Sequence, residues 1–182
     1  MDRKTFLKSL IVLGAAAPCM SMPASEKTGK CEDAQCTSDA AAVRQFLSGF
    51  IREQETSIDR ATLVKLMRER GRACCRNRKF RQDLIDQSAG NLDKLVELMG
   101  KIVGPPNCTR SGNTITLVYP VTKCVCGGNP DRPPMPHDPY CECSAENNRI
   151  LFETVAGKPV TSKVIESPRR GGVHCTFQLT LS

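Results

Sequence analysis

Two pairs of cysteines separated by one residue occur in the second half of the chain, a spacing that suits metal sites. The pairs are Cys124 with Cys126, and Cys141 with Cys143. In an extended strand, residues two apart point to the same face, so each pair would present its two thiols side by side. If the segments on either side of the Pro-rich loop 127–139 form a hairpin, four thiols meet in one small volume. Four thiolates are the ligand set of a tetrahedral zinc site or an iron–sulfur cluster.

Disulfide bonding would use the same geometry. The sequence holds eleven cysteines, and an even number remains when Cys19 in the leader is set aside. An oxidising compartment favours bridges among such a set. Bridges within one Cys-x-Cys pair, or between the adjacent Cys74 and Cys75, would be strained, because disulfides prefer Cα separations of about 4.4–6.8 Å. Two interpretations therefore stay open: a metal or reactive-thiol site, and structural disulfides.

Three further cysteines are secondary candidates. Cys74 and Cys75 end a basic helical segment, where arginines would lower a thiol pKa. Either residue could be a catalytic nucleophile, a redox partner or another metal ligand, and the alternative is a small buried apolar side chain. Cys175 lies on the predicted last strand as another metal-ligand candidate. His174 beside it should face the opposite way, and His137 in the Pro-rich loop is more simply a solvent-exposed imidazole.

Other kinds of site have little support in the sequence. With two histidines, and no Ser–His–Asp order or phosphate-binding glycine loop, most hydrolytic and His-based metal schemes are disfavoured. The absence of Trp argues against stacking platforms for sugars or bases. The formal net charge of +7 is concentrated between Lys65 and Arg81. We interpret this run as a solvated helical face and expect no nucleic-acid partner, because no nucleic-acid motif accompanies it.

Apolar residues at three- and four-residue spacing predict four helices in the first half. They span about residues 42–51, 56–71, 80–88 and 91–99. The second of these has a helix-start signal at its beginning, with side-chain oxygens before the apolar positions.

Residues rich in β-branched side chains predict four strands in the second half. The strands span 114–126 with an edge or bulge at Pro120, then 140–144, 160–166 and 173–181, and a helix at 147–155 separates the two pairs. We therefore expect an α+β fold: N-terminal helices packed on a four-stranded antiparallel sheet, with one helix between the two hairpins.

The N-terminus predicts export. Arg3, Lys4 and Lys8 precede an apolar stretch, residues 10–17, that is too short to span a bilayer. Residues 1–24 are thus predicted to be a signal peptide, similar to a twin-arginine leader with Lys4 in place of the second arginine.

Cleavage between Ser21 and Ser25 is favoured over a lipid anchor at Cys19, because a proline directly precedes that cysteine. Residues 25–38 are polar and predict a flexible lead-in, and residues 39–182 predict a single α+β domain. We expect a periplasmic or otherwise exported protein with no transmembrane segment, since no later stretch is long and apolar enough.

The C-terminal part resembles a group of bacterial proteins. The motifs are Tyr140-Cys141-x-Cys143-Ser144, Phe152-Glu153-x-x-x-Gly157-x-Pro159-Val160, Glu166-Ser167-x-x-x-Gly171 and His174-Cys175-x-Phe177. Over residues 124–181 the chain resembles Cys-rich exported proteins related to 4-vinyl-reductase-type (hydrocarbon-binding) domains and to L-2-amino-thiazoline-4-carboxylic acid hydrolase-like proteins. The resemblance implies helices and an antiparallel sheet around a small-molecule or lipid pocket. It also implies that Cys74 or Cys75, the two Cys-x-Cys pairs and Cys175 are ligands. Ala145-Glu146 stands where relatives often have Gly-Trp.

Taken together, these features predict a binding module rather than an enzyme. We expect an exported domain that holds zinc or an iron–sulfur cluster through Cys124, Cys126, Cys141 and Cys143, with a small apolar ligand as a second partner. One alternative is a small-molecule hydrolase or thiol-dependent enzyme that uses Cys74 or Cys75. The other is a structural domain stapled by disulfides.

Overall fold

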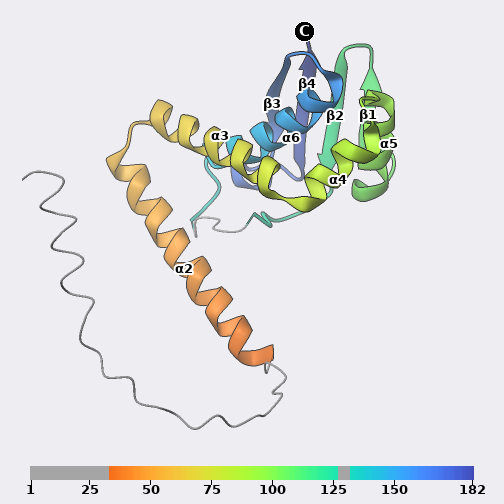
Figure 1. Ribbon diagram of the computed structural model, residues 1–182. Coiled ribbons are helices and arrows are strands. Elements are labelled where there is room, and N and C mark those ends of the chain that lie inside the picture. Colours follow the sequence, from red (N-terminus) through yellow and green to blue (C-terminus); the bar gives the residue numbers. More distant parts are fainter. Residues whose placement is uncertain (1–32, 127–131) are drawn as a thin grey trace, which may run out of the picture. The chain divides into compact units, whose positions relative to one another are not determined.

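The computed structural model describes residues 33–126 and 132–182, and for residues 33–40 and 44 it describes the backbone alone. Residues Thr37–Ser182 form one compact unit. The elements of the described residues are α2 (Asp33–Ser57), α3 (Arg60–Asn77), α4 (Lys79–Ser88), α5 (Leu92–Val103), β1 (Cys108–Ser111), β2 (Thr114–Tyr119), α6 (Cys141–Ala156), β3 (Val160–Glu166), the 3-10 turn η1 (Pro168–Arg170) and β4 (Cys175–Leu181) (Figure 1). The predicted signal peptide, with Cys19, lies outside the described residues.

The four strands form one antiparallel sheet in the order β1-β2-β4-β3. Helix α6 lies between the two strand pairs in the sequence, so the predicted α+β fold class is confirmed. None of the helices in the described ranges is both long and apolar enough to cross a membrane.

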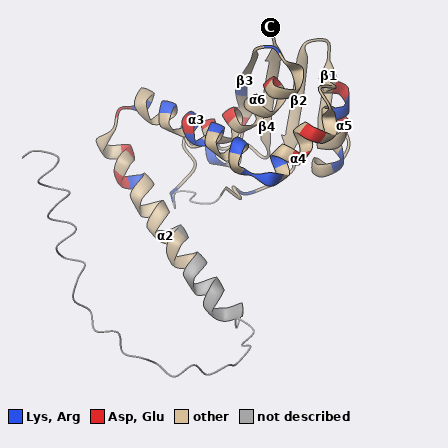
Figure 2. Ribbon diagram, in the orientation of Figure 1, with Lys and Arg blue, Asp and Glu red and all other residues tan. Residues whose placement is uncertain are grey.

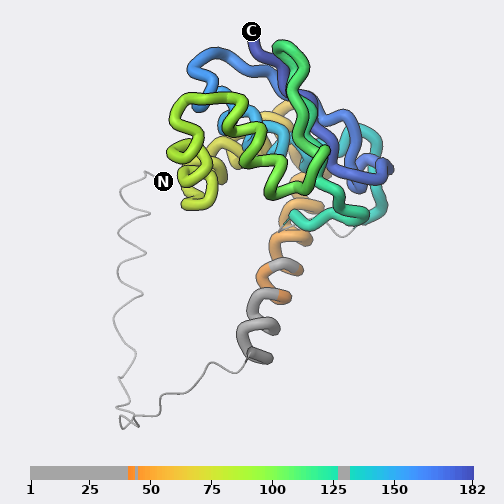
Figure 3. The backbone as a smooth tube through the Cα atoms, turned by 90° about the vertical axis from the view of Figure 1, so that its right-hand side faces the viewer, coloured from red at the N-terminus to blue at the C-terminus, as the bar shows by residue number. Residues whose placement is uncertain are grey.

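One face of the sheet is buried. Along β2 and β4, alternate residues face the helices, among them Ile115 and Leu117 of β2 and Phe177 and Leu179 of β4. The helices of residues 60–103 and 141–156 lie on one side of the strands (Figure 3). On the opposite face, Gln178 is exposed, so that face is solvated.

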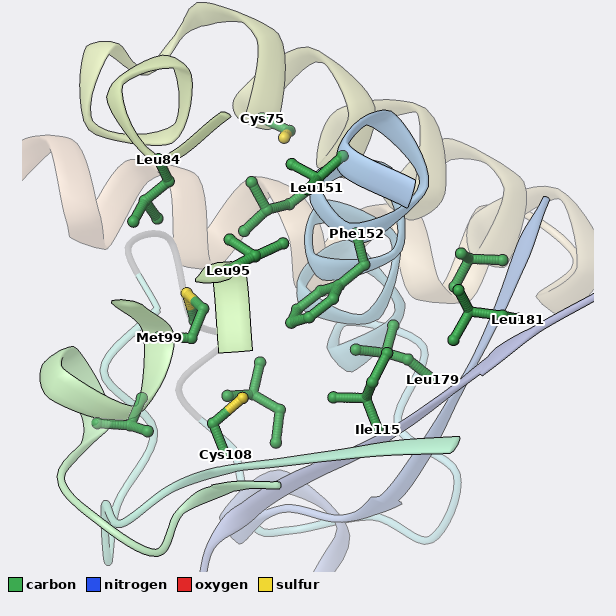
Figure 4. Packing of buried hydrophobic residues seen from close by; sticks show 14 residues of the cluster. Cys75, Leu84, Leu95, Met99, Cys108, Ile115, Leu151, Phe152, Leu179 and Leu181 are labelled. Carbon is green, nitrogen blue, oxygen red and sulfur yellow. The ribbon is translucent and has the colours of Figure 1, made fainter. Parts of the chain in front are cut away.

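The main hydrophobic core fills the space between the sheet and helices α4, α5 and α6. Leu95 and Met99 of α5 and Leu151 and Phe152 of α6 are almost fully excluded from solvent and meet side chains of the sheet (Figure 4). Each such side chain contributes about 1.5–3 kcal/mol through removal of apolar surface from water.

Local signals explain where several helices begin and end. Asp59 precedes α3, and its Oδ1 accepts a hydrogen bond from the Thr62 N–H at 3.1 Å. Asn91 does the same for Lys94 N–H at the start of α5, at 3.0 Å. Both side chains satisfy amides that have no partner within the helix. Helix α3 continues through Gly71, where the sequence pattern had suggested an end, and stops at Asn77.

The strand predicted for residues 140–144 is wrong, because residues 141–144 belong to helix α6 and Tyr140 directly precedes it. Asp138 and Pro139 come before Tyr140, and Asp138 Oδ1 accepts a hydrogen bond from the Tyr140 N–H at 2.9 Å. An Asp–Pro pair starts a helix well, since the Asp caps free amides and the Pro lacks one. This local capping outweighed the period-two pattern of the cysteines.

The extension of β2 to Cys126 is also wrong. The strand ends at Tyr119, directly before Pro120, and residues 121–126 have no regular secondary structure. Proline cannot donate a hydrogen bond to a neighbouring strand, which favours a strand end at this point. The partner of β2 in its hairpin is instead β1, joined to it by the two-residue turn Gly112–Asn113, and the sequence pattern had not predicted that strand.

Candidate functional site

Cys141 and Cys143 lie in the first turn of α6, not on a strand. In an α-helix, residues two apart are rotated by about 200°, so the two thiols do not face the same way. Cys141 is buried, and its Sγ lies 3.0 Å from Ser167 Oγ. Cys143 is half-buried. The pair therefore does not present two parallel thiols, as a hairpin would have.

Cys126 is the cysteine that influences the pKa of several others. It lies in the irregular segment after β2, and its thiol interacts with that of Cys124 through a hydrogen bond. Its Sγ also lies 3.6 Å from Ser144 Oγ, in the first turn of α6. Its charge acts on Cys141 and Cys143 of α6 and on Cys175, the first residue of β4. We call Cys124, Cys126, Cys141, Cys143 and Cys175 the thiol cluster.

Within this cluster, Cys126 holds the negative charge. The hydrogen bond from Cys124 lowers the pKa of Cys126, and Ser144 and the positive charge of Arg78 act in the same direction against burial. The pKa of Cys124 is correspondingly raised, so Cys124 keeps its proton. In such a pair the protonated thiol donates a hydrogen bond to its neighbour and thereby stabilises the neighbour as a thiolate.

The remaining thiols of the cluster are held neutral. Burial raises the pKa of Cys143 to about 11, and electrostatic repulsion from the neighbouring Cys74 and Cys126 adds to this effect. Burial likewise raises the pKa of Cys175 to about 11, with a contribution from Cys126. In the absence of a cation, the cluster therefore carries a single thiolate among protonated thiols.

The two adjacent cysteines of α3 have different surroundings. Cys75 is 0% exposed and belongs to the hydrophobic core, and burial raises the pKa of its thiol. Such a thiol is a poor nucleophile. Cys74 is half-buried and lies near enough to Cys143 to influence its pKa, which places Cys74 at the border of the cluster.

Helices α3 and α6 cross closely at Gly71, and this crossing positions Cys74. A Cβ atom at residue 71 would overlap the carbonyl oxygen of Cys143 and lie 3.0 Å from Glu146 Cβ. Asn147 Nδ2 donates a hydrogen bond to the Gly71 carbonyl at 3.3 Å. Only glycine allows this approach, and Cys74 follows within one helical turn.

Ion pairs hold the start of α6 in place, and none of their acidic residues had been singled out from the sequence. Asp138 is 0% exposed, and its Oδ2 accepts from Arg132 at 2.8 Å and Arg169 at 3.2 Å. On α6 itself, Glu142 binds Arg68 at 2.9 Å and Arg170 at 2.8 Å.

One turn further along α6, the buried Glu146 binds Arg72 at 2.6 Å and Arg149 at 2.9 Å. Figure 2 shows basic residues along α3, the helix that contains Arg68 and Arg72. Part of the basic run thus serves to dock α3 on α6.

The histidines lie apart from this chemistry. His137 is exposed with a positive φ of 57°, and its carbonyl accepts a hydrogen bond from Arg60. His174 is half-buried, and its Nδ1 atom has no hydrogen-bond partner among the described residues.

A soft metal suits the donor chemistry of the cluster but requires the thiols to approach one another. Thiolates are preferred ligands of zinc and of iron–sulfur clusters. Within residues 33–126 and 132–182, no three His, Cys, Asp or Glu side chains are arranged closely enough to hold a metal ion. Cys124 and Cys126 lie in a segment without regular structure, which can adjust more readily than a helix or strand.

Comparisons with known proteins concern the fold. No family model matches the sequence, and no curated protein matches it either. Among solved structures, the chain is similar to a trafficking protein particle complex subunit 3 from Naegleria fowleri, which was solved covalently bound to palmitic acid. The TM-score is 0.53 at 12% identity, and the match covers 80% of this chain and 96% of that one. At this identity the likeness shows a shared arrangement of helices and strands.

Proposed function

We propose that this domain binds a metal ion or an iron–sulfur cluster through Cys124, Cys126, Cys141 and Cys143, with Cys74 and Cys175 as neighbouring thiols. The observation that carries the proposal is the position of Cys126, whose charge acts on cysteines of α6 and of β4. Cys126 thus influences the pKa of thiols in two other parts of the chain, the start of α6 and the start of β4.

Electrostatics supports a cation at this place. Burial and the charge of Cys126 disfavour ionisation of the other thiols. The metal-free cluster therefore contains several protonated thiols. A bound divalent cation reverses that balance, because it stabilises thiolate ligands and releases their protons. The cluster is also partly shielded from water, which strengthens thiolate–metal attraction.

Export would bear on the chemistry of this site. If the leader directs the folded protein across the membrane, metal loaded beforehand protects the thiols from oxidation in the new compartment. We therefore propose an exported, metal-loaded domain, with a binding role rather than a defined reaction.

The test is metal analysis of the full chain purified without oxygen. We expect about one zinc per chain for a four-thiolate site, or iron with acid-labile sulfide and visible absorption for a cluster. Cys126→Ser and Cys143→Ser should each lower the metal content strongly. Cys108→Ala is the matched control, because Cys108 is a buried core thiol outside the cluster.

Two results would overturn the proposal. One is a metal-free protein whose cysteines are all oxidised, which would support the structural disulfides instead. The other is a metal content that stays unchanged in both Cys126→Ser and Cys143→Ser.

A further inference from the structure

A second region with binding character is a surface pocket beside the outer edge of the sheet. The pocket has a volume of about 420 Å³. Arg68 of α3, Glu142 of α6, Arg170 and the β3 residues 162–165 line it, together with Pro136 and His137. Volumes of roughly 300–1,000 Å³ are typical of pockets for small molecules. The thiol cluster contributes none of these lining residues.

The charges that line this pocket are unbalanced. Arg68, Lys163 and Arg170 are cationic, whereas Glu142 is the one carboxylate among the lining residues. Both oxygens of Glu142 are taken up: Arg68 donates to Oε2 from Nε at 3.1 Å and from Nη2 at 2.9 Å, and Arg170 donates to Oε1 at 2.8 Å. Three positive charges against one negative leave an excess of two.

Glu142 and a backbone carbonyl hold the Arg170 guanidinium in place. Its Nε and Nη2 donate to the Asp138 carbonyl at 3.2 and 2.9 Å, besides the bond to Glu142. The side chain therefore loses little further freedom when it meets an anion, which favours binding.

The edge of β3 adds hydrogen-bond donors to the pocket. The N–H of Val160 donates to Glu153, and its carbonyl accepts from Arg149, so both groups point away from β4. Because backbone groups of a strand alternate between its two edges, Ser162 and Val164 point theirs to the same outer edge. Ser162 Oγ is buried and has no hydrogen-bond partner among the described residues.

We propose that this pocket binds a small organic anion, through a carboxylate or phosphate group placed among Lys163, Arg68, Arg170 and the outer edge of β3 at Ser162. Excess positive charge attracts the anion, and arginines suit the planar or tetrahedral arrangement of its oxygens. The unpartnered hydroxyl of Ser162 gains the hydrogen bond that its burial otherwise denies it. This site is separate from the thiol cluster, so anion binding here can be tested independently of metal binding.

The experiment is an NMR titration of the ¹⁵N-labelled full chain at constant ionic strength. The probes are inorganic phosphate in one series and succinate in another, with sodium chloride as the reference salt. We expect saturable shifts of the amides of residues 162–165 with at least one probe, and the probe that saturates identifies the group as phosphate or carboxylate.

Variants test the named contacts. Ser162→Ala should weaken the affinity about two- to tenfold, the worth of one hydrogen bond. Lys163→Gln should weaken it about two- to fivefold, because its charge is exposed to solvent. Lys158→Gln, which removes one exposed charge outside the pocket lining, is the matched control and should leave the affinity unchanged.

Two outcomes would overturn the proposal: shifts that rise without saturation and equal those caused by chloride, or saturable binding with the same affinity in all three variants. The titration is repeated with Cys126→Ser, which should bind the probe as the unmodified chain does. Loss of metal in that variant with intact anion binding would show that the two sites are independent.

Discussion

The two ends of helix α6 are held by different forces. Toward its C-terminus, Leu151, Phe152 and Val155 pack into the main hydrophobic core. Toward its N-terminus, Cys141 and Ala145 belong to a much smaller apolar cluster, and Glu142 and Glu146 form ion pairs with arginines. One end supplies stability through apolar burial, while the other carries the groups that can do chemistry.

This difference teaches where the molecule tolerates reactive groups. Thiols and buried charges cost free energy in a dry core unless they have partners. At the start of α6 those partners are arginines from α3 and from the segment before β4. The core end needs none for the side chains that it buries in the core, because Leu151, Phe152 and Val155 are apolar. Substitutions at the two ends should therefore have different consequences.

The largest effect on stability should come from the core end. Phe152→Ala removes a side chain that is 0% exposed and should lower the free energy of unfolding by about 3–5 kcal/mol. Urea unfolding monitored by circular dichroism measures it. Phe80→Ala on α4 is the control and should cost less than about 1 kcal/mol, because that ring is 49% exposed. Equal losses for the two variants would contradict the placement of the core.

A smaller, pH-dependent effect should come from Glu146. Burial, the largest single influence, raises its pKa, but hydrogen bonds and charges from Arg149 and Arg72 outweigh it, so the pKa lies below the ordinary 4.5. The stabilisation is therefore present above pH 4.5 and is lost as the pH falls through the lower, folded-state pKa. At pH 7, Glu146→Gln should cost about 1.5–3 kcal/mol.

Unfolding experiments at pH 7, 5 and 3 follow this dependence. The difference between the unmodified chain and Glu146→Gln should be largest at pH 7 and shrink toward pH 3. A difference that is constant over this range would show that the ionised carboxylate does not contribute.

One methyl group added at residue 71, where α3 crosses α6, should lower the free energy of unfolding. Gly71→Ala should cost about 1–3 kcal/mol, because its Cβ would overlap the backbone of α6. Gly100→Ala in α5 is the matched control, since a Cβ there meets no atom within 4 Å. That change should be neutral or stabilise by up to about 1 kcal/mol through helix propensity. Thermal unfolding compares the two, and a neutral Gly71→Ala would refute the close crossing.

The smallest effect is a difference in alkylation rate among the cysteines, measured without a substitution. In the reduced, metal-free protein at pH 7.5, iodoacetamide should modify Cys126 first, because hydrogen bonding from Cys124 lowers its pKa. Cys108 should react among the last, since burial raises its pKa to about 11. Mass spectrometry of timed samples gives the order. In urea the order should vanish, and an order that persists there would point to local sequence rather than to the fold.

Short-range patterns predicted much of the fold. The apolar spacing of Leu92, Leu95 and Met99 identified α5, and the side-chain oxygens from Thr56 onward indicated the start of α3, whose observed cap is Asp59. Strand β1 escaped prediction because three of its four residues are exposed, so it shows no alternation. The start of α6 was mistaken for a strand because the cysteine spacing received more weight than the capping signal at Asp138.

The candidate site was predictable in composition but not in geometry. The cysteines of the two pairs were named from residue type and spacing, yet their relative placement depends on α6 being a helix and on where β2 ends. The partners of Asp138, Arg132 and Arg169, are brought to it by the tertiary fold. The capping position before Pro139 was the local signal that could have drawn attention to Asp138.

The close contact of Gly71 with α6 also fixes the rotational position, around the axis of α3, of the residues that follow Gly71. Each residue of a helix turns the next by about 100°. One residue inserted between Gly71 and Cys74 would leave the crossing intact and rotate Cys74 away from Cys143 by roughly a quarter turn or more. It would also turn Cys75 out of the core. The three-residue step from Gly71 to Cys74 thus sets which of two adjacent, chemically identical side chains reaches the thiol cluster and which one packs among hydrocarbons.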